Sequence, residues 1–480
     1  MAMSERISLL DRTLNSLRGA WRDSLRGAWR DIAASARDAL TSPPRPELSR
    51  EDAERLRSQL RDCLEGRGGE VSARARAAEL GRTYLALNAV GRERFLRLLA
   101  TEFDIDHREV ARISAQLQSA ADDFERRKVE RTLRQALEPP RVKLLTQFNG
   151  LPEGVKFLVD LRAELMRLGR EDVDLAALEQ DLKALLTSWF DIGFLELRCI
   201  TWDAPAALLE KLMLYEAVHE IRSWNDLKNR LEADRRCFAF FHPRMPQEPI
   251  IFLEVALTKG MSDNVQSLLD ESAPIGDPAD ADTANFYSIS NCQRGLWGIS
   301  FGDFLIKRVV DMLAAELPHL KTYATLSPIP GFGAWLEQRL GEEGDDLLKE
   351  DERAAIAGLS RGGNDGGLAT LIAAPDWIAD EVTVQALKAP LMRLCARYLL
   401  NETTPAGRAI DPVAHFHLSN GARIERINWR GDLSKKGLQQ SFGMMINYLY
   451  RLGDIEENHE AYTGEGRITA SAGVLRLIKD

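Results

Sequence analysis

Apolar residues recur every three or four positions through most of the first half of the chain, which is the spacing of one face of an α-helix. The pattern runs from Leu48 to about Trp189, and glycine or proline clusters such as Pro139-Pro140 interrupt it. Helical runs are expected at about 48–65, 71–90, 91–103, 107–124, 126–138, 155–168 and 174–188. Residues 48–189 therefore predict a helical bundle. It contains no group of His, Cys and carboxylate residues suited to chemistry, so we expect a scaffolding or oligomerisation role.

Short runs of β-branched and aromatic residues begin near Trp189. Strands are predicted at 194–202, 237–241 and 250–257, and the last two form a hairpin with a longer loop. A strand at 286–290, a glycine-rich loop, a helix-period run from Asp303 and an apolar run ending at Ser327 follow. Strand, loop, helix and strand predict a βαβ unit. Such units bind phosphates where the loop meets the helix.

The end of the chain predicts further strands and helices. Residues 413–418 and 422–429 alternate apolar and polar positions on both sides of Asn420-Gly421, which is a strong hairpin signal. A helix is predicted from about 435 to 450, ending with Tyr448 and Tyr450. We interpret the mostly helical stretch 341–410 as an insertion. The second half is thus α+β with a mixed sheet of six or so strands.

Composition narrows the possible functions. The chain has 480 residues, which favours two or more domains, and its net charge of −10 argues against nucleic acid as the main partner. The five cysteines are scattered without a C-x-x-C pair, so a metal site is not expected. Free thiols suit a reducing compartment, and we expect a cytoplasmic protein. No apolar run reaches the about 18–20 residues that span a membrane.

The N-terminal segment contains a tandem repeat, because residues 16–23 (SLRGAWRD) recur as residues 24–31. Transit peptides are poor in acids, whereas Asp11, Asp23 and Asp31 lie in this segment. We therefore interpret residues 1–47 as an amphipathic arm that the repeat lengthens.

Two positions in the βαβ unit are candidates for a site. Gly295, Gly298 and Gly302 let the backbone approach an anion closely, but their spacing matches neither Walker A nor the dinucleotide fingerprint. The loop is therefore either a phosphate-binding loop or a tight turn. Ser327 lies at the end of a predicted strand, where sites occur in α/β units, before a stiff Pro-x-Pro-Gly segment; the alternative is a turn serine.

Histidine and tyrosine supply the remaining candidates. His415 and His417 lie two positions apart on a predicted strand, so they would face the same side. They are either structural, or one of them is a general acid; no third ligand with suitable spacing supports a metal site. Tyr448 and Tyr450 are either core residues or phenol donors aimed into a site.

At this point several segments together resemble the malonyl-CoA decarboxylase family. They are FYSIS with QRGLWGISFGDFLIKRVV, LSPIPGF, APLMRLCARYL, DPVAHFHLSNGARIERINW and GMMINYLY. The resemblance covers about 190–480 strongly and 48–189 more loosely, and the residues before Leu48 lie outside it. It implies an α+β protein in which an N-terminal all-α helical bundle precedes a GNAT-like mixed-sheet catalytic domain. The expected domains are 1–47, 48–189 and 190–480, with the insertion at about 341–410.

The resemblance also implies the site. The family's catalytic serine falls on Ser327, its catalytic histidine on His417 and a functional tyrosine on Tyr450. Its acyl-CoA-binding loop falls on Trp297, Gly298, Ile299, Ser300, Phe301, Gly302 and Asp303. Ser300 stands where the family pattern has an acid, so a role of that carboxylate does not carry over.

The function that the resemblance implies is decarboxylation of malonyl-CoA to acetyl-CoA and CO2, in fatty-acid metabolism. The reaction would pass through a thioester enolate without a metal or redox cofactor. Ser327 would bind the carboxylate or relay a proton, His417 would protonate C2, and Tyr450 would orient one of them. A homo-oligomer, dimer or tetramer, is expected through the helical domain. The alternatives are an acyltransferase that moves an acyl group from CoA to an amine, and a CoA-sensing module without turnover.

Overall fold

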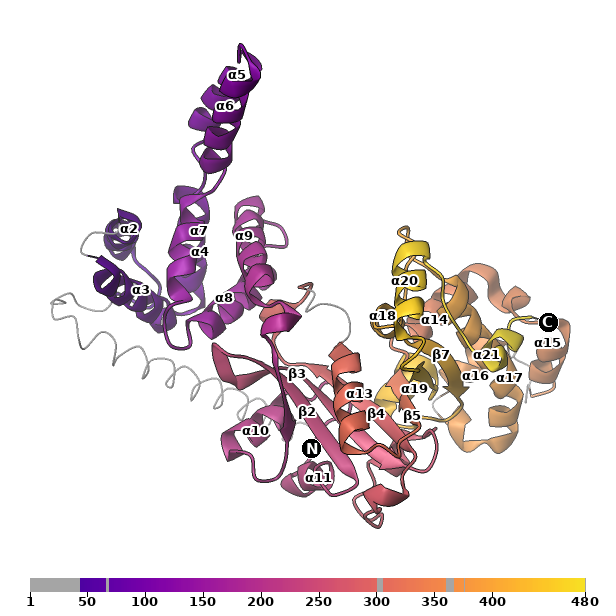
Figure 1. Ribbon diagram of the computed structural model, residues 1–480. Helices are drawn as coiled ribbons and strands as arrows, with labels where there is room; N and C mark the ends of the chain where they lie inside the picture. The colour runs from indigo at the N-terminus through magenta and orange to yellow at the C-terminus, as the bar shows by residue number, and fades with distance from the viewer. Residues whose placement is uncertain (1–43, 66–68, 300–304, 360–366, 375, 480) are drawn as a thin grey trace. The chain divides into compact units, whose positions relative to one another are not determined.

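The computed structural model describes residues 44–479 except 66–68, 300–304, 360–366 and 375 (Figure 1). The N-terminal repeat at 16–31 therefore lies outside the described residues. The chain divides into two compact units. Unit 1 takes the described residues of 1–196, 241–250 and 293–301, and unit 2 takes those of 197–240, 251–292 and 302–480.

Unit 1 is built mainly of helices, as the 3.6-residue pattern predicts. Buried leucines on the inner face of its last helix recur at positions 175, 178, 182 and 186. Asp side chains at 106, 122 and 172 accept hydrogen bonds from first-turn N–H groups and so begin three of the helices. The helices are α2 (Arg50–Glu65), α3 (Gly69–Ala86), α4 (Ala89–Glu102), α5 (His107–Gln118), α6 (Asp123–Ala136), α7 (Pro140–Phe148), α8 (Gly154–Leu168) and α9 (Val173–Trp189).

Helices α5 and α6 form a hairpin that extends away from the other helices of unit 1 (Figure 1). Ile113 is the buried residue of α5, and α6 has none. Phe124, near the start of α6, is 82% exposed. The hairpin therefore packs chiefly on itself and leaves apolar surface open.

The described residues form an eight-stranded mixed sheet, most of which belongs to unit 2. Its order is β1-β2-β3-β4-β5-β8-β6, and β7 also pairs with β8. The strands are β1 (Glu196–Ile200), β2 (Arg235–His242), β3 (Met245–Thr258), β4 (Thr283–Asn291), β5 (Thr322–Thr325), β6 (Ser327–Pro328), β7 (Arg423–Asn428) and β8 (Met445–Tyr450). The predicted hairpin of β2 and β3 is confirmed, but the longer loop expected between them is wrong, because only Pro243 and Arg244 connect these neighbouring strands.

The predicted βαβ unit is also confirmed. β4 and β5 are parallel, and α13 (Leu305–Glu316) connects them. Their ladder covers only Thr283–Phe286 of β4, although this strand continues to Asn291. Tyr287 is the extra residue of a bulge between β4 and β3, since Glu254 pairs with Ser288 and Val255 with Phe286. The two parallel strands thus part after four paired residues. The predicted fold class, a helical bundle ahead of a mixed-sheet domain, is confirmed.

Two predictions for the end of the chain were wrong. Residues 413–418 are not a strand but belong to helix α18 (Pro412–Ser419), because Asp411 caps this helix and Pro412 occupies its first turn, where a missing N–H costs nothing. Residues 435–450 are not one helix. Helix α19 (Lys435–Ser441) ends at Phe442 in the left-handed region, and β8 follows, pairing with β5, β6 and β7.

Helices connect and flank the strands of unit 2. Those in the stretch 332–401 include α17, which is long and continues through Pro390. The further helices of unit 2 are α10 (Ala206–Tyr215), α11 (Trp224–Asn229), α12 (Val265–Leu268), α14 (Phe332–Glu343), α15 (Glu350–Ala357), α16 (Leu368–Ala373), α17 (Glu381–Asn401), α20 (Ile455–Glu465) and α21 (Ala472–Arg476).

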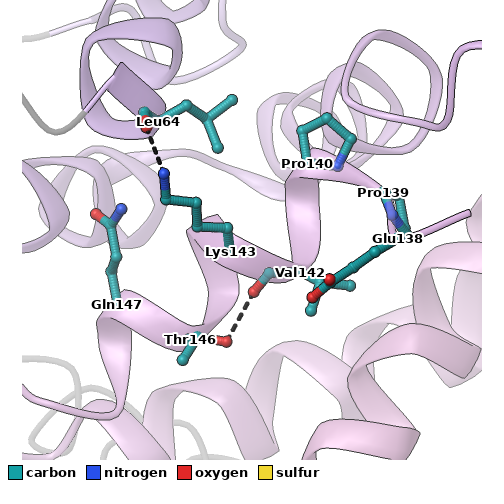
Figure 2. Close-up of a pocket in the computed structure, with 8 residues that line it drawn as sticks. All are labelled: Leu64, Glu138, Pro139, Pro140, Val142, Lys143, Thr146 and Gln147. Carbon is teal, nitrogen blue, oxygen red and sulfur yellow. Dashed lines mark hydrogen bonds between the residues drawn. The ribbon is translucent and has the colours of Figure 1, made fainter. Parts of the chain in front are cut away.

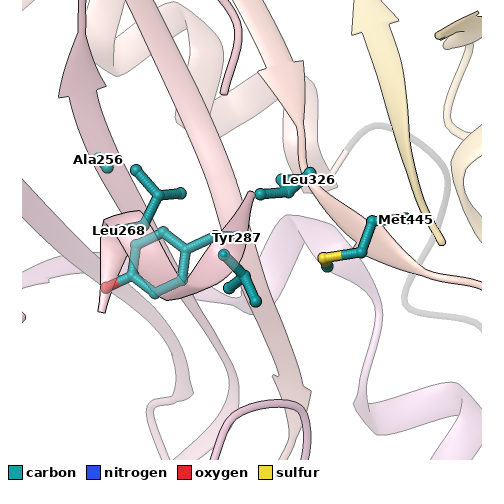
Figure 3. Close-up of a cluster of buried hydrophobic side chains, with 6 residues drawn as sticks. Ala256, Leu268, Tyr287, Leu326 and Met445 are labelled. Carbon is teal, nitrogen blue, oxygen red and sulfur yellow. The ribbon is translucent and has the colours of Figure 1, made fainter. Parts of the chain in front are cut away.

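One apolar cluster fixes the strands at the centre of the sheet (Figure 3). It joins β3, α12, β4 and β8 through buried side chains, namely Ala256, Leu268, Val265, Tyr287, Leu326 and Met445. Leu326 immediately precedes Ser327, and Met445 pairs with Pro328 across the ladder. This core therefore sets the position of the residue that the sequence marks as a catalytic candidate.

All five cysteines are free, as predicted; Cys199 is exposed and the other four are buried. Among the described residues, every helix is too short or too polar to cross a lipid bilayer.

Candidate active site

The candidate site lies in unit 2, on one face of the strands β5, β6 and β8. Ser327 pairs with Ile446 of β8, and Tyr448 and Tyr450 follow at alternate positions of that strand. Residues paired across an antiparallel ladder share a face, and alternate residues of a strand share it too. The Ser327 side chain and both tyrosines therefore point to the same side of the sheet, toward α18.

The sequence before His417 explains why the chain becomes a helix there. Asp411 is the N-cap residue of α18, and its Oδ1 accepts hydrogen bonds of 3.0 Å from the N–H groups of Val413 and Ala414. Pro412 fits the first turn because its fixed φ is helical. His417 lies near the end of this short helix, and its side chain is 2% exposed.

Three side chains of the predicted site form one hydrogen-bonded chain. The Ser327 hydroxyl lies 3.1 Å from Nε2 of His417, and Nδ1 of the same ring lies 2.8 Å from the hydroxyl of Tyr450. Ser327 also donates to Oγ1 of Thr325 at 2.9 Å. The structure thus brings together Ser327, His417 and Tyr450, which are more than 30 positions apart in every pairing. We call these three residues the Ser–His–Tyr chain.

The direction of the hydrogen bonds in this chain is not unique. In one arrangement Tyr450 donates to Nδ1, and Nε2–H donates to Ser327, which donates to Thr325. In the reverse arrangement Ser327 donates to Nε2 in place of Thr325, and Nδ1–H donates to Tyr450, whose own proton then has no acceptor among the described residues. Both arrangements satisfy a neutral imidazole. The first arrangement is therefore the one that gives every donor of the chain an acceptor.

Burial determines the charge state of the Ser–His–Tyr chain. It lowers the pKa of His417 to about 3, because the imidazolium ion would lose its water, and it raises the pKa of the Tyr450 phenol. No described carboxylate forms an ion pair with His417. The third member is a neutral phenol, in contrast to the Asp of a Ser-His-Asp triad. His417 is thus held neutral at physiological pH.

Tyr448 contacts the same imidazole in another way. Its ring stacks on that of His417, with 4.5 Å between centroids and 26° between planes. Its hydroxyl is buried and has no hydrogen-bond partner among the described residues. Tyr448 therefore contacts the imidazole through its ring, whereas Tyr450 contacts it through its hydroxyl.

Asp411 is a site residue that the sequence reasoning missed. It is 1% exposed, and its Oδ2 accepts from the N–H of Gly331 and from the hydroxyl of Tyr398, both at 3.3 Å. Burial raises its pKa, although four hydrogen bonds favour the ionised form. It thereby ties the turn after Ser327 to the helix of His417. An Asp-Pro pair ahead of an apolar run is a helix-start signal that could have identified it.

His415, the other candidate histidine, has a structural partner. Nδ1 of His415 lies 2.8 Å from the hydroxyl of Tyr462, which also accepts from the N–H of Ala409. This pairing connects α18 to α20. The described residues contain no group of three or more His, Cys, Asp or Glu side chains that could hold a metal ion.

Each unit has a cavity that described residues line. The cavity in unit 2 has about 690 Å³, and Tyr323 and Tyr450 are among its lining residues. The cavity in unit 1 has about 740 Å³ and lies beside α7, where Lys143 donates to the carbonyl oxygen of Leu64 (Figure 2). This hydrogen bond caps the end of α2, so we interpret this cavity as a structural feature of the helix packing.

The predicted acyl-CoA loop is described only in part. Trp297, Gly298 and Ile299 belong to unit 1, where they follow a short 3₁₀ turn at Arg294–Leu296. Ser300, Phe301, Gly302 and Asp303 lie outside the described residues. Trp297 is 53% exposed, Gly298 is also exposed, and Ile299 is buried.

Comparison with known proteins gives the class: this chain is an enzyme, a carboxy-lyase with a helical region ahead of a mixed-sheet domain. Residues 193–480 match the malonyl-CoA decarboxylase C-terminal domain, and residues 103–190 match the malonyl-CoA decarboxylase N-terminal domain. The chain belongs to the malonyl-CoA decarboxylase family.

Individual relatives agree. The mitochondrial malonyl-CoA decarboxylase of Anser anser anser is 40% identical over 422 residues, which cover 85% of this chain and 84% of the relative. That of Rattus norvegicus is 38% identical over 467 residues, covering 93% and 92%. The crystal structure of malonyl-CoA decarboxylase from Rhodopseudomonas palustris is 41% identical, with a TM-score of 0.80, and covers 88% of this chain and 99% of that one. The structure from Agrobacterium vitis is 40% identical, also at 0.80, and covers 89% and 100%.

Proposed function

We propose that this protein decarboxylates malonyl-CoA to acetyl-CoA and CO2 through a thioester enolate. The observation that carries the proposal is the buried Ser–His–Tyr chain, Ser327, His417 and Tyr450, in a member of the malonyl-CoA decarboxylase family. The reaction needs no metal or redox cofactor in this proposal, because the thioester carbonyl itself accepts the electron pair that CO2 leaves behind.

The chemistry sets three requirements. The carboxylate must be held out of the plane of the thioester carbonyl, so that the breaking bond overlaps the π system. Hydrogen-bond donors must face the oxygen where the enolate charge develops. A proton must then reach C2 of the enolate.

The Ser–His–Tyr chain suits these requirements because it is neutral. The Ser327 hydroxyl binds the substrate carboxylate or relays a proton, and His417 donates the proton to C2. A neutral serine and imidazole do not form an ion pair with the carboxylate, which would stabilise the ground state and oppose the loss of CO2. The enolate carbon is a strong base, so the neutral imidazole can donate its Nε2 proton. The ring regains a proton from water after acetyl-CoA and CO2 leave, which restores neutral His417 for the next turnover. Tyr450 orients the imidazole through Nδ1.

The loop 297–303 is proposed to bind the CoA moiety. Its described part, Trp297–Ile299, is exposed at two of three positions, as a ligand-binding loop requires. The proposal assigns no role to a carboxylate at position 300, where this chain has serine.

The decisive experiment is CO2 release from malonyl-CoA in the absence of any acceptor. Ser327→Ala and His417→Ala should each reduce turnover by about 10² or more, the usual effect of losing a catalytic donor or acid. His415→Ala is the matched control, because it lies on the same helix but contacts Tyr462. Near wild-type turnover of both site variants would refute the assignment. Transfer of the acyl group to an amine without CO2 release would indicate an acyltransferase instead.

We also propose a homo-oligomer formed through the helical domain, with the α5–α6 hairpin as the contact. Its apolar surface is open, as Phe124 at 82% and Leu137 at 48% exposure show. Phe124→Glu should shift the mass measured by light scattering toward the monomer, whereas an unchanged mass would exclude this residue from the contact.

We also propose a cytoplasmic location for the protein. Cell fractionation tests this location.

A further inference from the structure

The helical part of unit 1 holds the described part of the glycine-rich loop, residues 293–299. Gly295 lies so close to α8 that a Cβ there would be 1.7 Å from the carbonyl oxygen of Val159. Arg162 of α8 donates to the carbonyl oxygens of Gly295 at 2.6 Å and of Trp297 at 3.0 Å. Arg162 is 2% exposed and is neutralised by Glu179 of α9 at 2.8 Å. The loop backbone is therefore fixed by a buried ion pair.

The exposed side of the same loop carries an aromatic ring and a cation. The indole of Trp297 is 53% exposed, and the guanidinium of Arg294 lies 5.6 Å from its centroid. Gly298 adopts φ of +72°, a conformation that favours glycine, and it leaves its backbone open to solvent.

A second cation reaches the loop from α9. The Nζ of Lys183 lies 3.6 Å from the position that a Cβ on Gly298 would occupy. The acids nearest in sequence on α9 are engaged elsewhere, since Glu179 binds Arg162 and Asp181 binds Arg141. No described carboxylate forms an ion pair with Lys183. Its charge is thus left available beside an open backbone.

We propose that Lys183, Arg294 and Trp297 bind the phosphorylated adenosine end of acyl-CoA. One face of the Trp297 indole lies against Arg294, and the other is open to solvent. The two cations would contact phosphate oxygens, and the indole would stack on the adenine. Arg162 is a positioning residue that fixes the loop for this contact. This inference rests on the proposed function and deepens it, because the helical domain then supplies a substrate-binding residue as well as a scaffold.

The test compares two substrates. Malonyl-CoA carries the nucleotide, and malonyl-pantetheine lacks it. Lys183→Met keeps the length of the side chain and removes its charge. It should raise KM for malonyl-CoA about tenfold, the low end for a charge-assisted hydrogen bond, because Lys183 is only half-buried. KM for malonyl-pantetheine and both kcat values should stay unchanged.

Controls separate binding from structure. Lys228→Met, at an exposed lysine of α11, should change neither substrate's KM. Arg162→Lys keeps a charge but loses the planar pair of donors, and it should reproduce the KM split with kcat retained. An equal rise of KM for both substrates in Lys183→Met would overturn the inference, and so would an unchanged KM for malonyl-CoA.

The inference can be tested even if malonyl-CoA is not turned over. Adenosine 3′,5′-bisphosphate is then titrated into wild type and Lys183→Met by calorimetry. Binding that weakens about tenfold in the variant supports the site, and equal binding or none overturns it. With active enzyme, competitive inhibition by the bisphosphate against malonyl-CoA is expected. Non-competitive inhibition would indicate a separate nucleotide site and refute the assignment to the substrate.

Discussion

Replacing Tyr450 with phenylalanine removes a single oxygen atom from the centre of the site. That hydroxyl lies 2.8 Å from Nδ1 of His417 and is the partner of this nitrogen among the described residues. The ring remains, so no cavity forms. His417 is 2% exposed, so water does not replace the lost bond.

The expected cost follows from this burial. A buried polar atom left without a partner costs about 1–3 kcal/mol. In the proposed mechanism the imidazole exchanges a proton at Nε2, so its Nδ1 bond changes in strength during the reaction. Part of the cost then falls on the transition state, and kcat should fall about 10–100-fold, at 1.4 kcal/mol for each factor of ten. Urea unfolding should show the rest as lost stability.

Tyr448→Phe is the matched control. Tyr448 lies on the same strand face and stacks on the same imidazole, but its hydroxyl has no partner among the described residues. Removing that hydroxyl should leave kcat within a few-fold of wild type and should not lower stability. CO2 release and urea unfolding are measured on both variants. The reasoning is refuted if Tyr450→Phe keeps wild-type kcat and stability, or if both variants lose activity equally.

Three further predictions concern stability. Arg230 lies between two buried carboxylates, 2.7 Å from Asp226 and 2.9 Å from Glu254, so Arg230→Met should cost about 3–5 kcal/mol in urea unfolding; a loss under 1 kcal/mol would contradict this. Gly295→Ala places a methyl group against a carbonyl oxygen of α8 and should cost about 1–3 kcal/mol or more, seen as a lower Tm, whereas an unchanged Tm would show that the loop can move away. The pKa of His417 is about 3 when folded and 6.5 when unfolded, so the unfolded state binds the extra proton between these values and stability is lost as pH falls below 6.5. His417→Gln should remove up to about 1.4 kcal/mol per pH unit of that loss, measured by unfolding at pH 7, 6 and 5; parallel curves for both proteins would refute it.

Secondary structure decides which side chains meet at this site. The local sequence predicted the wrong secondary structure for both segments of the site. Residues 445–450 are apolar throughout, a run that suits a helix or a buried strand. On a helix, Tyr448 and Tyr450 would point about 200° apart. In β8 they share a face, and both therefore reach His417.

The opposite error occurred at the two histidines. On a strand His415 and His417 would face the same side, as the sequence pattern predicted. On α18 they point apart, His415 to Tyr462 and His417 to Ser327. The single general-acid candidate is thus separated from its neighbour by helix geometry.

The sequence by itself determined the helical bundle, the βαβ unit and the family. Helical periodicity recurs over 48–189 so many times that local exceptions do not change the prediction of a helical bundle. The strand–loop–helix–strand order can be predicted from residues that are neighbours in the sequence. Family motifs also identified Ser327, His417 and Tyr450 as candidates. Their chemistry depended on more than their identity.

Only the tertiary structure decided the state and the surroundings of these candidates. Burial by distant segments makes His417 neutral, since no local pattern removes water from its ring. Asp411 joins two segments 80 positions apart, and Lys183 reaches a loop 115 positions away. Hydrogen bonds and charge act over a few ångströms of space, and the fold alone determines which residues lie within that range.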